Sequence, residues 1–160
     1  MAEFTGILCP GDITTVYTRT VIALGTRAQD TKGNEYIFLE GVASCVAGSW
    51  VTYDENGVTT LLAANVIGPV AVAMAAIDDA DNEMGWFQIY GTAIGCAGAT
   101  LDENDVVGRT GADGYVGDGP VAGDIIYGCI CRSALEDGSP NTTTTFTINY
   151  PFVDDQTAGH

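Results

Sequence analysis

The feature that most constrains the fold is an alternation of side-chain type at every second residue, which recurs in short segments along the chain. Turn-forming residues separate these segments roughly every ten residues, and no stretch keeps a helical period for long. Successive side chains of a strand point to opposite faces, so this pattern is typical of strands. The sequence therefore predicts an all-β fold, a single-domain β-sandwich or β-barrel.

The first half of the chain carries the clearest strand patterns. In segment 36–39, two aromatic residues share one face and two aliphatic residues share the other, so both faces should be covered. Segments 49–53 and 58–62 flank the turn 54–57, whose Asn-Gly pair is a strong signal for a β-hairpin. We expect all three segments to be strands.

Segment 68–77 begins with Gly-Pro and alternates larger residues with alanines. Because alanine favours helices, a helix is the alternative, but the segment is short and its period is two, which favours a strand. The acidic turn 78–83 then leads into the aromatic segment 86–90. We expect the two strands on either side of this turn to form a hairpin.

The second half repeats the pattern more weakly, with short strands expected at 106–108, 114–116 and 125–131. The last strand, 142–150, has apolar residues on one parity and mostly threonines on the other, so one face should be buried. Pro151 indicates that this strand ends at a sheet edge. The residues expected in the core are Trp50, Val72, Trp86, Phe87, Ile89, Tyr90, Ile126, Phe146 and Ile148.

The chain is strongly acidic. Its 160 residues contain 21 Asp and Glu against 5 Lys and Arg, which gives a formal net charge of −16. Nucleic acid and anionic membrane surfaces are bound through basic patches, so this charge excludes both classes of partner. The 5 cysteines are scattered and odd in number, which is typical of reduced thiols in a protein made in a cytosol.

Residues for catalysis or metal binding are few. The only histidine is His160, and Cys129 and Cys131 form a C-x-C pair without the second pair that a zinc site requires. A Ser/His/Asp or Cys/His set therefore lacks its base. The acidic turns 78–83 and 101–105 do not match an EF-hand loop, although ion binding there stays an alternative. We expect no enzyme and no cofactor, with a glycosidase that uses paired carboxylates as the open alternative.

The aromatic segment 86–90 allows two interpretations. Trp86 and Tyr90 share one face of the strand and could stack on a sugar, with Gln88 between them as a hydrogen-bond donor. Phe87 and Ile89 make the opposite face equally apolar, which is what the central strand of a two-layer core requires. The core interpretation is favoured, and a carbohydrate-binding module is the alternative.

Five segments form a series: LGT at 24–26, GNEYIF at 33–38, AGSWV at 47–51, GPVAVA at 68–73 and GWFQIYGTA at 85–93. In this order they resemble small structural proteins of tailed bacteriophages, the head decoration or cement proteins. The resemblance implies a jelly-roll or β-tulip-like domain, often trimeric, that sits on the outer surface of the capsid and bridges major capsid proteins. It carries over no catalytic residue and no cofactor.

The resemblance also implies an extended N-terminal arm, because such arms frequently reach into the shell. Here the arm is residues 1–12, and its apolar residues Phe4, Ile7 and Leu8 are the expected anchors. The β-rich domain is expected at 13–153 and a flexible tail at 154–160.

Two arginines complete the expected contact residues. Arg19 and Arg27 are close in sequence and could pair with carboxylates of the shell, with solvated surface arginines as the alternative. The implied partners are the major capsid protein and further copies of this chain, on a virion made in a host cytoplasm. Another virion component, such as a tail or fibre-base protein, is the alternative.

Overall fold

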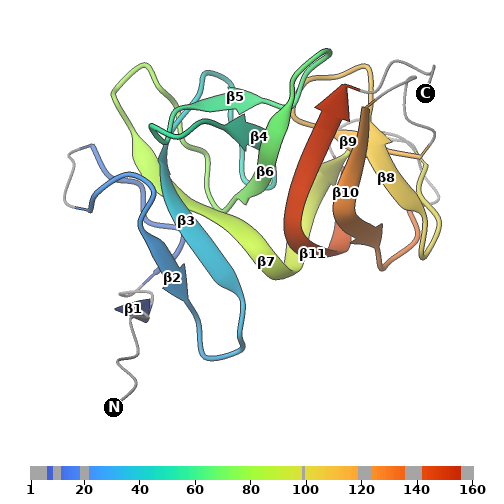
Figure 1. The fold of residues 1–160 in the computed structure, drawn as a ribbon, viewed down its shortest axis with the longest axis horizontal. Helices are drawn as coiled ribbons and strands as arrows, with labels where there is room; N and C mark the ends of the chain where they lie inside the picture. The colour runs from blue at the N-terminus through green and yellow to red at the C-terminus, as the bar shows by residue number, and fades with distance from the viewer. Residues whose placement is uncertain are drawn as a thin grey trace.

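The computed structural model describes residues 7–8, 12–18, 22–98, 100–118, 124–135 and 142–155. These residues form 11 strands and no helix, joined in one continuous sheet (Figure 1), so the predicted all-β fold is confirmed. In chain order the strands are β1 (Ile7–Leu8), β2 (Arg27–Gln29), β3 (Glu35–Glu40), β4 (Trp50–Tyr53), β5 (Thr59–Leu61), β6 (Gly68–Ala73), β7 (Met84–Ala97), β8 (Val106–Arg109), β9 (Val116–Gly117), β10 (Asp124–Cys131) and β11 (Thr142–Asp155).

The sheet divides into two parts that share the 14-residue strand β7. In the first part, the N-terminal sheet, the first half of β7 lies between β3 and β6, with β2 beyond β3, and β4 and β5 beyond β6. In the second part, the C-terminal barrel, pairing runs from β7 through β9, β8, β10 and β11 and back to β7. Figure 1 shows the N-terminal sheet on the left and the barrel on the right. Closing the ring pairs strand edges that would otherwise be open.

Strand β7 passes from one part to the other through a bend at Gly91. This glycine has a φ of 102°, which residues with a side chain rarely adopt, and a Cβ there would collide with the amide oxygen of Asn34. That oxygen accepts a hydrogen bond from the N–H of Thr92 at 3.1 Å. The amide nitrogen of Gln88 donates to the carbonyls of Tyr90 and Thr92. Two side chains therefore satisfy backbone groups at the bend.

The core lies on both faces of the central strands. In β3, Tyr36 and Phe38 pack in one buried cluster, whereas Ile37 and Leu39 pack in another on the opposite face. Strand β6 likewise directs its valines into the barrel cluster and its alanines into the cluster of the N-terminal sheet. Of the residues predicted for the core, the following are at most 1% exposed: Trp50, Val72, Trp86, Phe87, Ile89, Ile126, Phe146 and Ile148.

The prediction that Tyr90 belongs to the core is wrong, since 39% of this residue is exposed. Counting every second residue from Trp86 through Gln88 puts Tyr90 on the buried face. The β3–β7 register, however, shifts next to Glu35, and the strand bends at Gly91. An extra residue in one strand changes the face to which the following side chains point. Tyr90 therefore leaves the core where β7 crosses to the barrel.

Strand β11 does not end at Pro151, as the sequence predicted, but continues to Asp155. Pro151 lies near an irregularity in the β10–β11 ladder, where Gly128 has a φ of 73°. A strand tolerates proline at a bulge because no ladder hydrogen bond is needed from its nitrogen there. The predicted tail thus begins inside β11, and its residues 156–160 lie outside the described residues.

Candidate protein-binding surface

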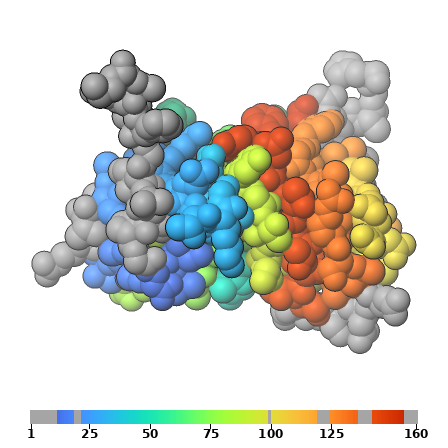
Figure 2. All heavy atoms as spheres, turned by 90° about the horizontal axis from the view of Figure 1, so that it is seen from below, coloured from blue at the N-terminus to red at the C-terminus, as the bar shows by residue number. Residues whose placement is uncertain are grey.

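Outward-facing side chains of β7, β11, β10 and β8 form a row of aliphatic and threonine residues. Thr92, Thr147, Ile130 and Val106 are register partners in successive strands, so they lie side by side across the barrel. Val106 is 60% exposed, Ile130 is 40% exposed, and the nearby Ile94 is 63% exposed. Figure 2 shows these four strands next to one another on one side of the molecule. This side of the barrel presents apolar surface to solvent.

Aromatic residues extend this row beyond the irregularity in β10 and β11. Tyr127 and Phe152 are register partners and are both exposed. Tyr90 and Tyr150 lie beside the bend of β7, with ring centroids 5.4 Å apart. Seven of the ten exposed large apolar residues in the described chain belong to the barrel strands, and we call this set the barrel surface: Tyr90, Ile94, Val106, Tyr127, Ile130, Tyr150 and Phe152.

The strands that carry the barrel surface are nearly free of charge. In a chain with 21 acidic residues, the segments 84–97, 125–131 and 142–153 contain no Asp, Glu, Lys or Arg. The charged residues that end β8 and begin β10, Arg109 and Asp124, are buried. The strands themselves therefore place no exposed charge under a partner, which would be costly, and the nearest charge is that of the exposed Arg132, which donates to Thr147.

Tyr150 is held in place by three neighbours. Its hydroxyl donates to the Glu35 carboxylate at 2.7 Å, its ring lies against that of Tyr90, and the guanidinium carbon of Arg27 lies 5.9 Å from its centroid. The hydrogen bond to Glu35 raises the pKa of Tyr150. The backbone of Tyr150 has a φ of 44°, which costs free energy for a residue with a side chain. Arg27, predicted to bind a partner, is exposed in this cluster.

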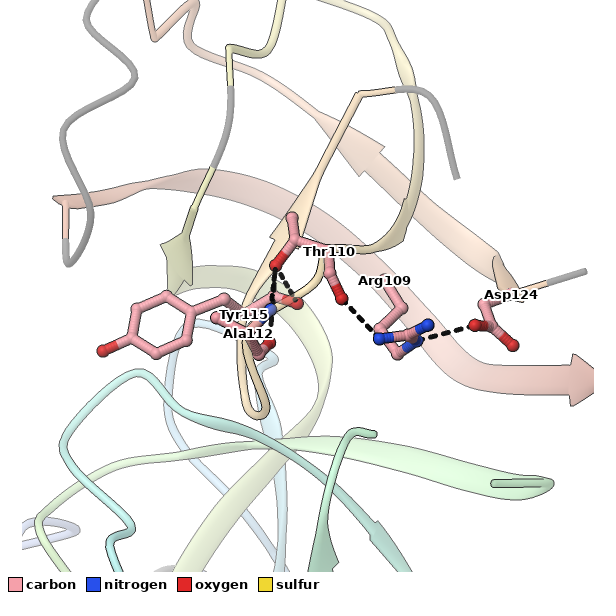
Figure 3. Close-up of polar contacts among 5 residues, drawn as sticks. All are labelled: Arg109, Thr110, Ala112, Tyr115 and Asp124. Atoms are coloured by element: carbon pink, nitrogen blue, oxygen red, sulfur yellow. Dashed lines mark hydrogen bonds and ion pairs between the residues drawn. The ribbon is translucent and has the colours of Figure 1, made fainter. Parts of the chain in front are cut away.

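A buried ion pair fixes one end of the barrel. The Nε of Arg109 in β8 lies 2.6 Å from the carboxylate of Asp124 in β10 (Figure 3). The Nη1 of Arg109 also donates to the carbonyl of Thr110 at 2.6 Å. The hydroxyl of Thr110 accepts from the N–H of Ala112 and donates to the carbonyl of Tyr115, within the turn that follows. The ion pair ties β8 to β10 and so supports the strands of the barrel surface.

The N-terminal arm contributes a strand to the sheet. The backbone of Ile7 and Leu8 pairs in parallel with β2, at the edge of the N-terminal sheet. The predicted arm thus lies along the domain at these two positions. Phe4 and Arg19, also predicted to bind a partner, lie outside the described residues, as do the side chains of Ile7 and Leu8.

The acidic turns use carboxylates to bind their own backbone. In turn 78–83, Glu83 accepts a hydrogen bond from the N–H of Asp78 at 2.8 Å. In turn 101–105, Asp105 accepts one from a backbone N–H at 2.7 Å. Such contacts are common where Asp and Glu occupy turns. Within the part of the chain that the structure describes, no three His, Cys, Asp or Glu side chains gather to hold a metal ion.

The two tryptophans are inaccessible to a ligand. Trp86 is fully buried and packs edge-to-face on Phe38, with ring centroids 5.2 Å apart. Trp50 is equally buried, and its Nε1 donates to the carbonyl of Cys96 at 3.1 Å. Among the described residues, the Nε1 of Trp86 is the one buried side-chain polar atom without a hydrogen-bond partner. A sugar could stack on neither ring in this conformation.

Two open hollows, of about 250 Å³ and 180 Å³, were candidates for an active site. The larger has Asp54 as the sole carboxylate among its described lining residues, beside Tyr53 and threonines. The smaller is lined by small and apolar residues and one threonine, and it includes Ala73 and Ile94. Neither hollow brings together the two carboxylates that glycoside hydrolysis requires.

Reasoning from the sequence missed most of the barrel surface. The sequence assigns Tyr90 to the core and places Tyr150 and Phe152 on the apolar parity of the last strand, which it predicts to be buried; both are exposed instead, and the other four members receive no role. The uncharged runs at 84–97 and 142–153 do not single out this surface, because segments 41–53 and 56–77 also contain no Asp, Glu, Lys or Arg. The positions that face outward could not be chosen, since irregularities in the ladders change the parity.

No family model, curated protein or solved structure matches this chain. The described residues include no helix with the length and hydropathy needed to cross a membrane. Support for a function therefore comes from the resemblance in the sequence and from the barrel surface.

Proposed function

We propose that this protein is a structural component of a tailed-phage virion, a decoration protein that binds the outer surface of the capsid. It stabilises the shell by bridging major capsid proteins, and it is made in the host cytoplasm. The proposal is supported by the series of segments that resembles decoration proteins. It is also supported by a surface suited to protein contacts.

The barrel surface is the observation that carries this proposal. Exposed apolar patches on soluble proteins commonly mark sites of protein binding. Burial of such a patch contributes about 25 cal/mol per Å² of apolar area, and here no formal charge in the patch offsets that gain. Hydrogen-bonded strands carry the patch, so little backbone entropy is lost when a partner covers it.

The direct test is a particle-binding assay. Heads of the phage that encodes the chain are prepared without this protein, mixed with the full-length chain and sedimented. We expect the chain to co-sediment and to raise the temperature at which packaged DNA is released. A chain that stays in the supernatant and leaves the release temperature unchanged would refute the proposal.

A second assay tests the arm. Deleting residues 1–8 removes Phe4, Ile7 and Leu8 but leaves β2 to β11 intact. We expect the truncated chain to fold and to bind heads more weakly. Binding equal to that of the full chain would show that the arm is no anchor.

A carbohydrate-binding module is a second candidate, favoured by the exposed ring pair of Tyr90 and Tyr150 beside Glu35. Aromatic faces can stack on sugars, and a carboxylate can accept hydrogen bonds from sugar hydroxyls. A glycan array probed with and without calcium separates the candidates. A glycan signal that Tyr90→Ala removes would favour this function, and silence in both conditions would remove it.

A further inference from the structure

We infer that the barrel surface docks on a protein whose contact patch has an apolar centre and a rim of Lys and Arg side chains. The inference rests on the proposed function. It adds which side of the molecule faces the shell and which chemistry the shell offers there. Four features lead to it: the uncharged centre, the acidic rim, a preformed tyrosine anchor and the poor fit of a second copy.

The border of the barrel surface holds the carboxylates of Asp102, Glu103 and Glu35 beside two arginines, Arg27 and Arg132. Asp102 and Glu103 are exposed in the turn that precedes β8. Arg132 joins this turn to the row of β11, because it donates to the amide oxygen of Asn104 at 2.7 Å and to the hydroxyl of Thr147 at 3.0 Å. The acidic turn therefore lies directly beside the apolar row. A protein with basic residues around its patch would bring them against these carboxylates.

Tyr150 supplies a preformed anchor at another border of the surface. Its backbone is left-handed, with a φ of 44°, and its side chain contacts the ring of Tyr90 and the carboxylate of Glu35. Strained residues of this kind gather at functional sites, and tyrosine is among the residues that contribute most to binding at interfaces. Glu35, beside Tyr150, adds a third carboxylate to the rim and offers a further contact to a basic residue.

A second copy of this chain fits the surface poorly. Two-fold packing of the barrel surface would bring the rims of two copies together, and each copy carries a net charge of −16. Carboxylates such as Asp102 and Glu103 would then approach their like. A basic rim on a different protein turns this repulsion into attraction and guides the approach of the two surfaces.

The test uses full-length variants and phage heads that lack this protein. Ile94→Glu places a charge on the barrel surface, at a side chain exposed enough to leave the fold intact. The pair Asp102→Lys and Glu103→Lys reverses the rim. The matched control, Asp79→Lys and Asp81→Lys, makes the same change of net charge in the exposed turn between β6 and β7. Circular dichroism and the melting temperature verify that each variant is folded.

Affinity for the heads is measured between about 0.1 M and about 1 M salt, over which the screening length falls from about 10 Å to about 3 Å. We expect Ile94→Glu to weaken binding by about tenfold or more at every salt concentration. The rim pair should weaken binding by about tenfold at low salt and flatten its salt dependence, and the control pair should do neither.

Each other outcome contradicts the inference. Equal effects of the rim pair and the control pair would show that only the total charge matters. Wild-type affinity in Ile94→Glu would show that another surface docks. Self-association of the free chain in sedimentation velocity, abolished by Ile94→Glu, would assign the surface to a second copy. If the wild-type chain fails to bind heads, the proposed function and this inference are both wrong. If the wild-type chain binds and the variants bind with the same affinity, only this inference is wrong.

Discussion

Replacing Gly95 by alanine would place a methyl group against the indole of Trp50. A Cβ at residue 95 would lie 2.7 Å from the indole Nε1 and 2.8 Å from Cε2 and Cζ2, whereas ordinary contacts fall at 3.4–4 Å. The indole is fully buried and packs edge-to-face on Phe146, with centroids 5.0 Å apart. Because a rigid ring in a full core has little space to move into, the substitution must displace it.

The cost follows from two contributions. Overpacking a well-filled core costs about 1–3 kcal/mol. Displacing the ring also weakens the hydrogen bond from Trp50 Nε1 to the Cys96 carbonyl, for about 1 kcal/mol more. We therefore expect Gly95→Ala to lower the free energy of unfolding by about 2–4 kcal/mol. At about 2–4 °C per kcal/mol for a chain of this size, the melting temperature should fall by about 4–16 °C.

Gly111→Ala is the matched control. No atom lies within 4 Å of a Cβ at residue 111, and this glycine is not in the left-handed region. Both substitutions restrict the unfolded chain to a similar extent, so the difference between them isolates the packing at Trp50. Urea unfolding followed by tryptophan fluorescence measures both. A difference below about 1 kcal/mol would refute the packing that the structure assigns to Gly95.

Three further substitutions or modifications test the polar and thiol groups. Asp124→Asn leaves the guanidinium of Arg109 buried without its counter-ion and should cost about 3–5 kcal/mol in urea unfolding, whereas the double variant Arg109→Met with Asp124→Leu should recover most of that loss. Tyr150→Phe removes the bond to Glu35, which raises the pKa of Tyr150 above the ordinary value of 10.0. The stabilisation from this bond is present below pH 10.0 and is lost as the pH rises through the raised pKa, so the stabilities of wild type and variant should converge at alkaline pH and differ most below it. Burial raises the pKa of the Cys45 thiol to about 11; we expect the native protein to resist alkylation there at about pH 8 until urea unfolds it, and rapid modification of the native thiol would contradict its burial.

Local patterns in the sequence predict the hairpins well. The Asn-Gly turn after Tyr53 joins β4 to β5, and the Val-Ala alternation of β6 forms a strand paired with β7. In both cases the decisive residues are neighbours in the chain. Strand β6 resists its alanine-based helix propensity because both of its faces are buried, the valines on one side and the alanines on the other.

Features that depend on distant residues could not be predicted. The exposure of Tyr90 depends on the bend at Gly91, and that bend depends on Asn34, which lies far away in the sequence. The continuation of β11 through Pro151 depends on the irregularity that Gly128 introduces in β10. Closure of the barrel includes a parallel pairing between β7 and β9, at Ala97 and Val116. None of these contacts leaves a periodic signal in the strand it affects.

The high charge and the apolar surface of this chain are related. Exposed carboxylates occur at turns, such as Asp54, Asp79 and Glu103, while the barrel strands between turns carry almost none. An exposed apolar surface promotes aggregation, and a large net charge of one sign opposes it by repulsion between copies. Acidic turns can thus keep the free protein dispersed while the barrel surface stays uncovered. The same carboxylates then favour a basic partner over a second copy, so one distribution of charge supports both solubility and choice of partner.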